Sequence, residues 1–155
     1  MANDERSSSQ LSATEVLTTR VLDAPRERVF AAWTDPAQLT RWWGPAGFTS
    51  TFLVHEPRAQ GAWRFILHGP DGRNYENHGV FAELLPPSRI VFEHQSGPVY
   101  RASFDFEALG GRTRVRWHMR FENERFLAQH GALVVSANDE NLDRLEAVLS
   151  GPARA

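Results

Sequence analysis

Apolar and polar residues alternate with a period of two over Phe48–Phe121, a pattern typical of half-buried β-strands. Turn-forming residues divide this stretch at Pro70–Arg73, Pro86–Ser88, Ser96–Pro98 and Gly110–Gly111. A segment rich in valine, threonine and leucine near the N-terminus predicts one more strand. The predicted strands are therefore Thr14–Leu22, Phe48–Glu56, Ala62–Gly69, Asn74–Leu85, Arg89–Gln95, Val99–Leu109 and Arg112–Phe121.

Two short helices are expected between the first two of these strands. Pro25 suits the first turn of a helix, where its missing N–H is not needed, and apolar residues follow it at helical spacing. Asp35-Pro36 begins a second helix as cap and first-turn proline. The apolar residues are Val29, Phe30 and Trp33 in the first helix, and Leu39, Trp42 and Trp43 in the second.

The C-terminal segment Glu124–Leu149 carries an apolar stripe at helical spacing, and Gly131 is expected to divide it into a short helix and a long one. An antiparallel sheet with one apolar face needs a cover, which this helix can supply. The predicted fold class is therefore α+β, with a curved antiparallel sheet of about seven strands wrapped around a long C-terminal helix.

The Gly110-Gly111 turn predicts the register of the last hairpin. Glu107 lies opposite Arg114 and Asp105 opposite Arg116, while the other face is purely apolar. A shift of the register by one residue would place charged and apolar residues on the same face. The clean separation of charged from apolar residues therefore supports this pairing. The apolar pairs are Phe106 with Val115, Phe104 with Trp117, and Ala102 with Met119.

The same reasoning at Pro70–Arg73 places Trp63 opposite Val80 and Phe65 opposite His78. These two hairpins and the alternation along the other strands define an inner face for the sheet. Its predicted members are Trp63, Phe65, Leu67, His78, Val80, Ala82, Ile90, Phe92, His94, Phe104, Phe106, Val115, Trp117 and Met119.

Composition narrows the function. The 155 residues fit one domain, expected over residues 13–151, with a disordered lead-in at 1–12 and a tail at 152–155. The chain has no cysteine and a net charge of −2, so we expect no disulfide, no nucleic-acid partner and a cytoplasmic location. No apolar run is long enough to span a membrane, and the polar start of the chain does not resemble a signal peptide.

An ordered set of motifs resembles the activator of heat shock protein 90 ATPase homologue-like branch of the START-like, helix-grip superfamily. The most specific is Trp42-Trp43-Gly44-Pro45, followed by Gly47-Phe48. The other carriers are Ala24-Pro25, Trp33-Thr34-Asp35-Pro36, Gly61, Trp63-Arg64, Pro70-Asp71-Gly72, Gly79-Val80, Pro86-Pro87 and Arg89-Ile90-Val91-Phe92. The resemblance implies a cavity between the sheet and the C-terminal helix, and superfamily members bind sterols, lipids, polyketides or hormones.

The resemblance is incomplete in two places. The eukaryotic chaperone activator has an additional N-terminal chaperone-binding domain, for which this chain has no room. Family members often carry Gly-Trp in the C-terminal helix, where this chain has Asn138-Asp139-Glu140-Asn141. Asn138 and Asn141 fall on or near the apolar stripe, and a buried amide needs a partner. That partner is a ligand, another side chain or a water.

The first functional hypothesis is binding of a small hydrophobic ligand of lipid, polyketide or aromatic type. No catalytic residue or cofactor is predicted, because the chain has no nucleophile elbow, phosphate loop or dinucleotide fingerprint. No metal ligand is predicted, because no two histidines stand at metal-ligand spacing within one element. The predicted ligand-binding residues are Trp43, Phe48, Trp63, Phe65, His78, Val80, Phe92, His94, Phe104, Trp117, Met119, Val134, Asn138 and Leu142.

Two alternatives stay open. A polyketide-cyclase or hydrolase-like enzyme would use His78, His94 or Glu76 as acid and base, which requires these side chains to converge on a cavity. The same histidines are also compatible with a structural role at the rim of the core. A chaperone-associated module with a stress-response role would expose an apolar patch instead. A homodimer is compatible with each hypothesis.

Overall fold

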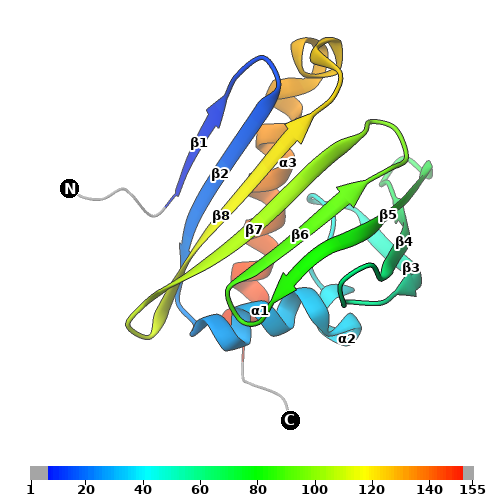
Figure 1. Ribbon diagram of the computed structural model, residues 1–155. Coiled ribbons are helices and arrows are strands. Elements are labelled where there is room, and N and C mark those ends of the chain that lie inside the picture. The colour runs from blue at the N-terminus through cyan, green and yellow to red at the C-terminus, as the bar shows by residue number, and fades with distance from the viewer. Residues whose placement is uncertain (1–6, 152–155) are drawn as a thin grey trace.

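The computed structural model describes residues 7–151, and all of its strands join one antiparallel sheet (Figure 1). The eight strands are ordered β1-β2-β8-β7-β6-β5-β4-β3. The strands are β1 (Ser7–Leu11), β2 (Glu15–Leu22), β3 (Thr49–His55), β4 (Ala62–His68), β5 (Asn74–Leu85), β6 (Arg89–His94), β7 (Tyr100–Leu109) and β8 (Arg112–Phe121). The helices are α1 (Arg26–Thr34), α2 (Pro36–Leu39) and α3 (Glu124–Ser150).

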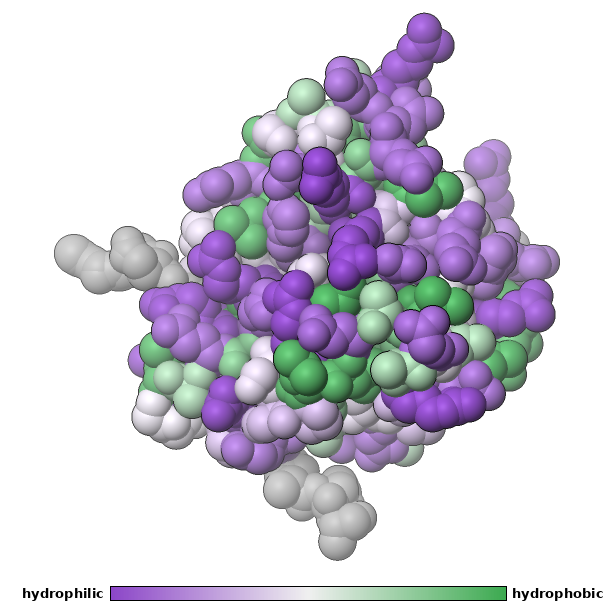
Figure 2. All heavy atoms as spheres, viewed as in Figure 1, coloured by the Kyte–Doolittle hydropathy of each residue, from purple (hydrophilic) through white to green (hydrophobic). Residues whose placement is uncertain are grey.

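Helix α3 crosses one face of the sheet, and α1 and α2 close one end of it (Figure 1). The core lies between these layers, because inward-facing residues of the strands are buried together with Leu142 and Leu145 of α3. The opposite, outer face is mostly hydrophilic (Figure 2). This arrangement confirms the predicted α+β fold with a long C-terminal helix.

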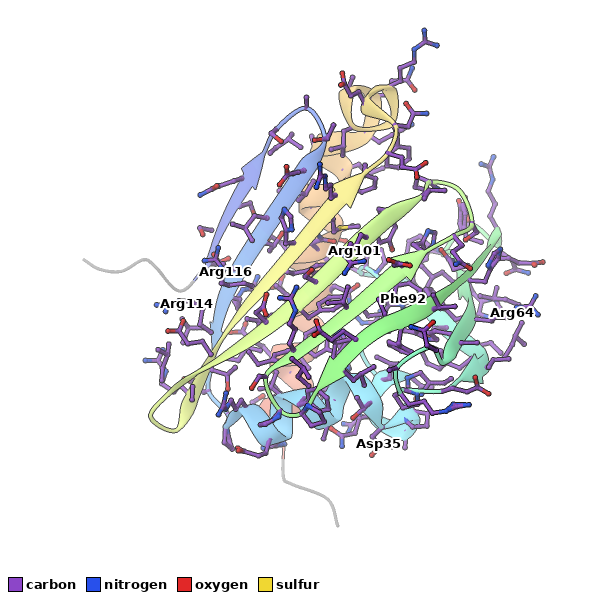
Figure 3. The ribbon with its side chains drawn as sticks, viewed as in Figure 1. Asp35, Arg64, Phe92, Arg101, Arg114 and Arg116 are labelled. Atoms are coloured by element: carbon purple, nitrogen blue, oxygen red, sulfur yellow. The ribbon has the colours of Figure 1, made fainter. Side chains whose placement is uncertain are left out.

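The predicted strands are present, with ends that agree within one residue. The β7–β8 register is also as predicted, with Glu107 opposite Arg114 and Phe104 opposite Trp117. On the outer face, which carries Arg101, Arg114 and Arg116 (Figure 3), Arg114 bonds Glu107 at 2.9 Å. Asp105 lies opposite Arg116 but accepts two hydrogen bonds from Arg89, at 2.7 and 2.9 Å.

Strand β1 corrects the predicted disordered lead-in, because Ser7–Leu11 pairs with β2 as an edge strand. It raises the count from about seven strands to eight. Its five residues are all exposed, so they show no apolar alternation. Backbone hydrogen bonds to β2 mainly define such a strand, and they leave no pattern in the sequence. Residues 1–6 and the predicted tail at 152–155 lie outside the described residues.

The predicted register of β4 with β5 is wrong by one residue. Arg64 lies opposite His78 and Phe65 opposite Asn77, because the connecting loop includes Gly69. The Gly69 N–H donates to Arg73 O at 2.8 Å and closes this longer loop. A shift of one residue exchanges the faces of a strand. His78 and Val80 therefore face outward, and Ala82 occupies a bulge between Phe81 and Glu83.

The helices differ from the sequence prediction in two places. Helix α2 ends at Leu39, and the following turn buries both Trp42 and Trp43, which are 0% and 7% exposed. Helix α3 continues through Gly131 without a break. A Cβ on Gly131 would lie 3.0 Å from Leu11 side-chain atoms. This glycine therefore allows β1 to approach the helix rather than ending it.

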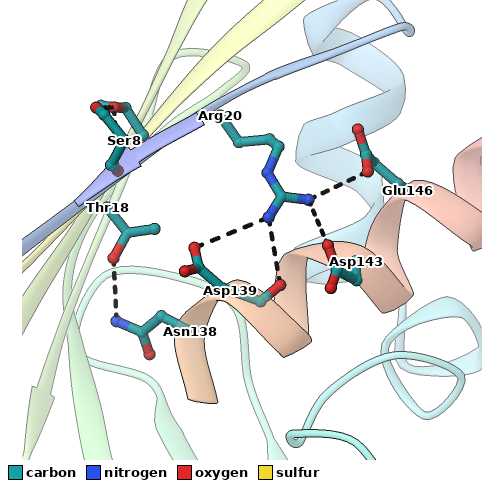
Figure 4. A network of polar contacts seen from close by, with 8 residues as sticks. Ser8, Thr18, Arg20, Asn138, Asp139, Asp143 and Glu146 are labelled. Atoms are coloured by element: carbon teal, nitrogen blue, oxygen red, sulfur yellow. Dashed lines mark hydrogen bonds and ion pairs between the residues drawn. The ribbon is translucent and has the colours of Figure 1, made fainter. Parts of the chain in front are cut away.

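A buried arginine joins β2 to α3 (Figure 4). Arg20, 7% exposed, donates to Asp143 at 2.9 Å and to Glu146 at 3.1 Å. Its Nη2 lies 3.8 Å from Asp139 Oδ1. Burial raises the pKa of the Asp139 carboxyl, an effect that the nearby guanidinium opposes. The ion pairs hold strand β2 against the C-terminal half of α3.

Arg20→Met is expected to lower the free energy of unfolding by about 2 kcal/mol in urea denaturation. This is less than the cost of breaking a fully buried pair, because the Asp143 and Glu146 side chains are 67% and 34% exposed and keep access to water. Arg112→Met is the control, since its side chain and that of its partner Asp23 are 50% and 73% exposed. If the two substitutions lower the free energy of unfolding equally, the buried Arg20 ion pairs do not stabilise the fold more than the exposed Arg112–Asp23 pair does.

Candidate functional site

A cavity of about 180 Å³ lies between the sheet, the loop after α2 and helix α3. Its walls are aromatic and aliphatic, with a few amide and hydroxyl groups. None of the described residues that line it carries a charge. The lining residues are Trp43, Gly44, Pro45, Phe65, Leu67, Asn77, Tyr100, Trp117, Met119, Val134, Ala137, Asn138 and Asn141.

Side chains of α3 hold the loop that forms one wall of the cavity. Asn141 donates to Trp42 O at 2.8 Å and accepts from the Gly44 N–H at 3.3 Å. Arg144 donates to Gly44 O at 2.7 Å and to three further carbonyls of the segment after α2. The loop thus gains partners for backbone groups that no strand or helix satisfies. These bonds fix the position of Trp43.

Each residue of the polar run Asn138-Asp139-Glu140-Asn141 in α3 has a defined contact. Asn138 is 5% exposed, and its Nδ2 lies 3.4 Å from Thr18 Oγ1 (Figure 4). The same Nδ2 lies 3.4 Å from Met119 Sδ. Asp139 faces Arg20, and Glu140 accepts from the Ala46 N–H at 3.1 Å. Asn141 bonds backbone groups through both its amide oxygen and its amide nitrogen, whereas Asn138 makes only the two long contacts.

Aromatic packing explains why the cavity is small. The Trp43 ring lies 5.8 Å from Trp117 at an interplanar angle of 24°, and 5.0 Å from Trp63. It also meets Phe65 edge to face at 6.0 Å. Among the described residues, no group accepts a hydrogen bond from the buried indole nitrogens of Trp43, Trp63 and Trp117. Ring contacts therefore hold this wall in place.

At the other end of the cavity, His94 supports the lining residues Asn77 and Tyr100. Its Nε2 lies 2.7 Å from Asn77 Oδ1, and its Nδ1 lies 2.8 Å from Pro98 O. The imidazole also stacks on the Tyr100 ring at 4.4 Å and 8°. Burial lowers the pKa of His94 and raises that of the Tyr100 hydroxyl. Both groups are thereby held neutral, in keeping with the uncharged lining.

The predicted ligand-binding residues divide into three groups. Those that line the cavity are Trp43, Phe65, Trp117, Met119, Val134 and Asn138. Those that lie in or beside the core without lining it are Phe48, Trp63, Phe92, His94, Phe104 and Leu142. His78 and Val80, predicted on the inner face, instead face outward because of the β4–β5 register.

Sequence reasoning missed Gly44, Pro45, Leu67, Asn77, Tyr100, Ala137 and Asn141 as lining residues. A signal existed for some of them. Tyr100 shares its strand parity with Ala102 and Phe104, and Ala137 lies on the apolar stripe of α3. Gly44 and Pro45 reach the cavity only because α3 binds their loop. Asn77 required the correct β5 register.

The acid–base arrangement required by the enzyme alternative is not found in residues 7–151. His78 and Glu76 are exposed on the outer face, whereas His94 is buried and held by Asn77 and Pro98. The same residues contain no cluster of three His, Asp or Glu side chains that could hold a metal ion. No helix within this range is long and apolar enough to cross a membrane.

A curved antiparallel sheet, a long helix across it and a cavity between them define the START-like, helix-grip class of proteins. A family model described as Activator of Hsp90 ATPase homolog 1-like protein matches residues 23–150. The chain therefore belongs to this family. No curated protein matches the sequence.

Several solved structures share this fold. A protein from Arthrobacter aurescens is 28% identical with a TM-score of 0.86, over 95% of this chain and 93% of its own. A protein from Rhodobacter sphaeroides is 23% identical with a TM-score of 0.83, over 93% and 97%. The AHSA1 protein of Silicibacter pomeroyi is 21% identical with a TM-score of 0.71, over 88% and 97%. Likeness at these identities supports the fold.

Proposed function

We propose that this protein binds a small hydrophobic molecule in the cavity between the sheet and α3. The observation that carries this proposal is a 180 Å³ space with aromatic walls and an uncharged lining. A cavity of about 150 Å³ is enough to hold benzene, whereas sites for drug-sized ligands span roughly 300–1,000 Å³. The volume therefore favours a ligand of aromatic type over a lipid or a polyketide.

The chaperone-associated alternative would need a continuous exposed apolar surface. The exposed large apolar residues come instead from β1, β3, β5, the segment before β7, and α3. They are Leu11, Leu53, Tyr75, Leu85, Val99 and Leu133. Surface apolar residues on separate elements are normal for a globular protein. We therefore propose the small molecule, rather than a chaperone or a second copy of the chain, as the partner.

Ala137→Phe is expected to abolish binding of small aromatic compounds, because the added ring fills the cavity that Ala137 lines. Titration with p-xylene, followed by amide chemical shifts in NMR spectra, measures the affinity. Ala132→Phe adds the same ring to an exposed position of α3 and is expected to bind like the unsubstituted protein.

Native mass spectrometry of freshly purified protein provides an independent test, since a retained small molecule would give its own mass. The proposal is wrong if the unsubstituted protein binds no neutral aromatic compound at millimolar concentration. It is also wrong if Ala137→Phe binds p-xylene as well as Ala132→Phe does.

A further inference from the structure

Four lining residues, Asn77, Tyr100, Asn138 and Asn141, carry amide or hydroxyl groups, and two of these are fully engaged by the protein. Asn77 Oδ1 lies 2.7 Å from His94 Nε2, and its Nδ2 donates to Tyr75 O at 2.9 Å. Asn141 uses both its amide oxygen and its amide nitrogen to hold the Trp42–Gly44 segment. These two amides therefore position the walls and have little capacity left for a ligand.

The other two polar residues keep unused hydrogen-bonding capacity. Asn138 is 5% exposed, and its Nδ2 makes only two long contacts of 3.4 Å. Within the part of the chain that the structure describes, its Oδ1 has no hydrogen-bond donor. The half-buried Tyr100 hydroxyl likewise has no partner there, although its ring is stacked on His94. Neither atom is among the fully buried side-chain atoms that lack a partner, whereas the indole nitrogens of Trp43 and Trp117 are. Asn138 Oδ1 and the Tyr100 hydroxyl are therefore accessible to a molecule that enters the cavity.

The unused groups specify a complementary chemistry. An amide oxygen needs a donor, and a tyrosine hydroxyl can donate to an acceptor. A single hydroxyl group on a ligand meets both needs, because it donates to Asn138 Oδ1 and accepts from Tyr100. A charged ligand would lose its hydration without gaining an opposite charge from the lining.

We infer that the cavity selects a neutral phenol, a single aromatic ring whose hydroxyl bonds Tyr100 and Asn138. The inference rests on the proposed function and adds the chemical class of the ligand. The ring lies in the space bordered by Trp43, Trp117 and Val134. The volume of 180 Å³ accommodates one ring with small substituents.

Two ligands of nearly equal size distinguish the affinity gained from hydrogen bonds to a hydroxyl group from the affinity gained by burying an aromatic ring. p-Cresol and p-xylene differ only by a hydroxyl in place of a methyl group. Tyr100→Phe removes one hydroxyl and keeps the ring that stacks on His94. We expect this substitution to weaken p-cresol binding by about five- to tenfold, as the loss of one hydrogen bond does, and to change p-xylene binding less than twofold.

Asn138→Leu is a second variant, in which the amide becomes an apolar group of similar size, and the same selective loss of p-cresol affinity is expected. Tyr75→Phe is the matched control, because the other tyrosine is 44% exposed and does not line the cavity. Circular dichroism verifies that each variant is folded before calorimetric titration.

The outcomes separate the two proposals. If both probes bind but neither variant weakens p-cresol selectively, the phenol assignment is overturned and the proposed function stands. If neither probe binds the unsubstituted protein, the proposed function and the inference fail together. A selective loss of p-cresol binding in both variants, absent in Tyr75→Phe, supports the assignment.

Discussion

Gly79→Ala is expected to lower the free energy of unfolding by at least about 3 kcal/mol, because strand β5 has no room for a side chain at this position. Gly79 faces the core opposite His94. A Cβ there would lie 2.0 Å from the backbone oxygen of Glu93 and 2.7 Å from the Phe92 ring. A backbone oxygen cannot move aside as a flexible side chain can, so strands β5 and β6 would have to separate. Urea denaturation measures the loss.

Gly111→Ala is the matched control for this substitution. A Cβ on Gly111, in the β7–β8 turn, would meet no atom within 4 Å. Replacing glycine at such a position also restricts the unfolded chain, so its stability is expected to stay equal or rise by up to about 1 kcal/mol. A Gly79→Ala protein as stable as Gly111→Ala would show that the β5–β6 spacing described above is wrong.

Trp43→Ala is expected to cost about 3–5 kcal/mol of unfolding free energy, the range for deleting a large buried aromatic side chain. Trp43 is 7% exposed and packs against Trp42, Trp63 and Trp117. The substitution would also enlarge the cavity and remove one of its walls. Thermal and urea denaturation measure the stability, and p-xylene titration measures the effect on the site.

Tyr75→Ala is the control for the loss of a large aromatic residue, because Tyr75 is 44% exposed. Its effect on stability is expected to stay within about 1 kcal/mol. Trp43→Phe should retain part of the ring packing and lose less stability than Trp43→Ala. If Trp43→Ala and Tyr75→Ala are equally stable, Trp43 does not hold the sheet, the loop and the helix together.

The position of His78 shows how the fold could be predicted while the site was only partly predicted. The strand and its turn were recognised, but the loop between β4 and β5 is longer than the sequence pattern suggests. That difference of one residue moves His78 and Val80 outward and brings Asn77 and Gly79 inward. The close packing at Gly79 explains why this residue faces inward: only a residue without a side chain fits against Glu93 and Phe92.

The polar residues of α3 show a second limit. Helical spacing places Asn138 and Asn141 on or near the apolar stripe, but the partners of these polar residues belong to distant segments. Asn141 bonds Trp42 and Gly44, and Asp139 faces Arg20. Such pairings depend on how the loop and β2 are placed against the helix. A local sequence pattern contains no information on that placement.

The sequence by itself determined the seven longer strands, the long C-terminal helix and the β7–β8 register. Periodicity and turn chemistry are local properties, so they can be seen along the chain. Only the tertiary structure decided the addition of β1, the face of His78 and the volume of the cavity. These depend on backbone pairing, on clearance between strands and on the packing of aromatic rings from separate elements, which meet only after the chain has folded.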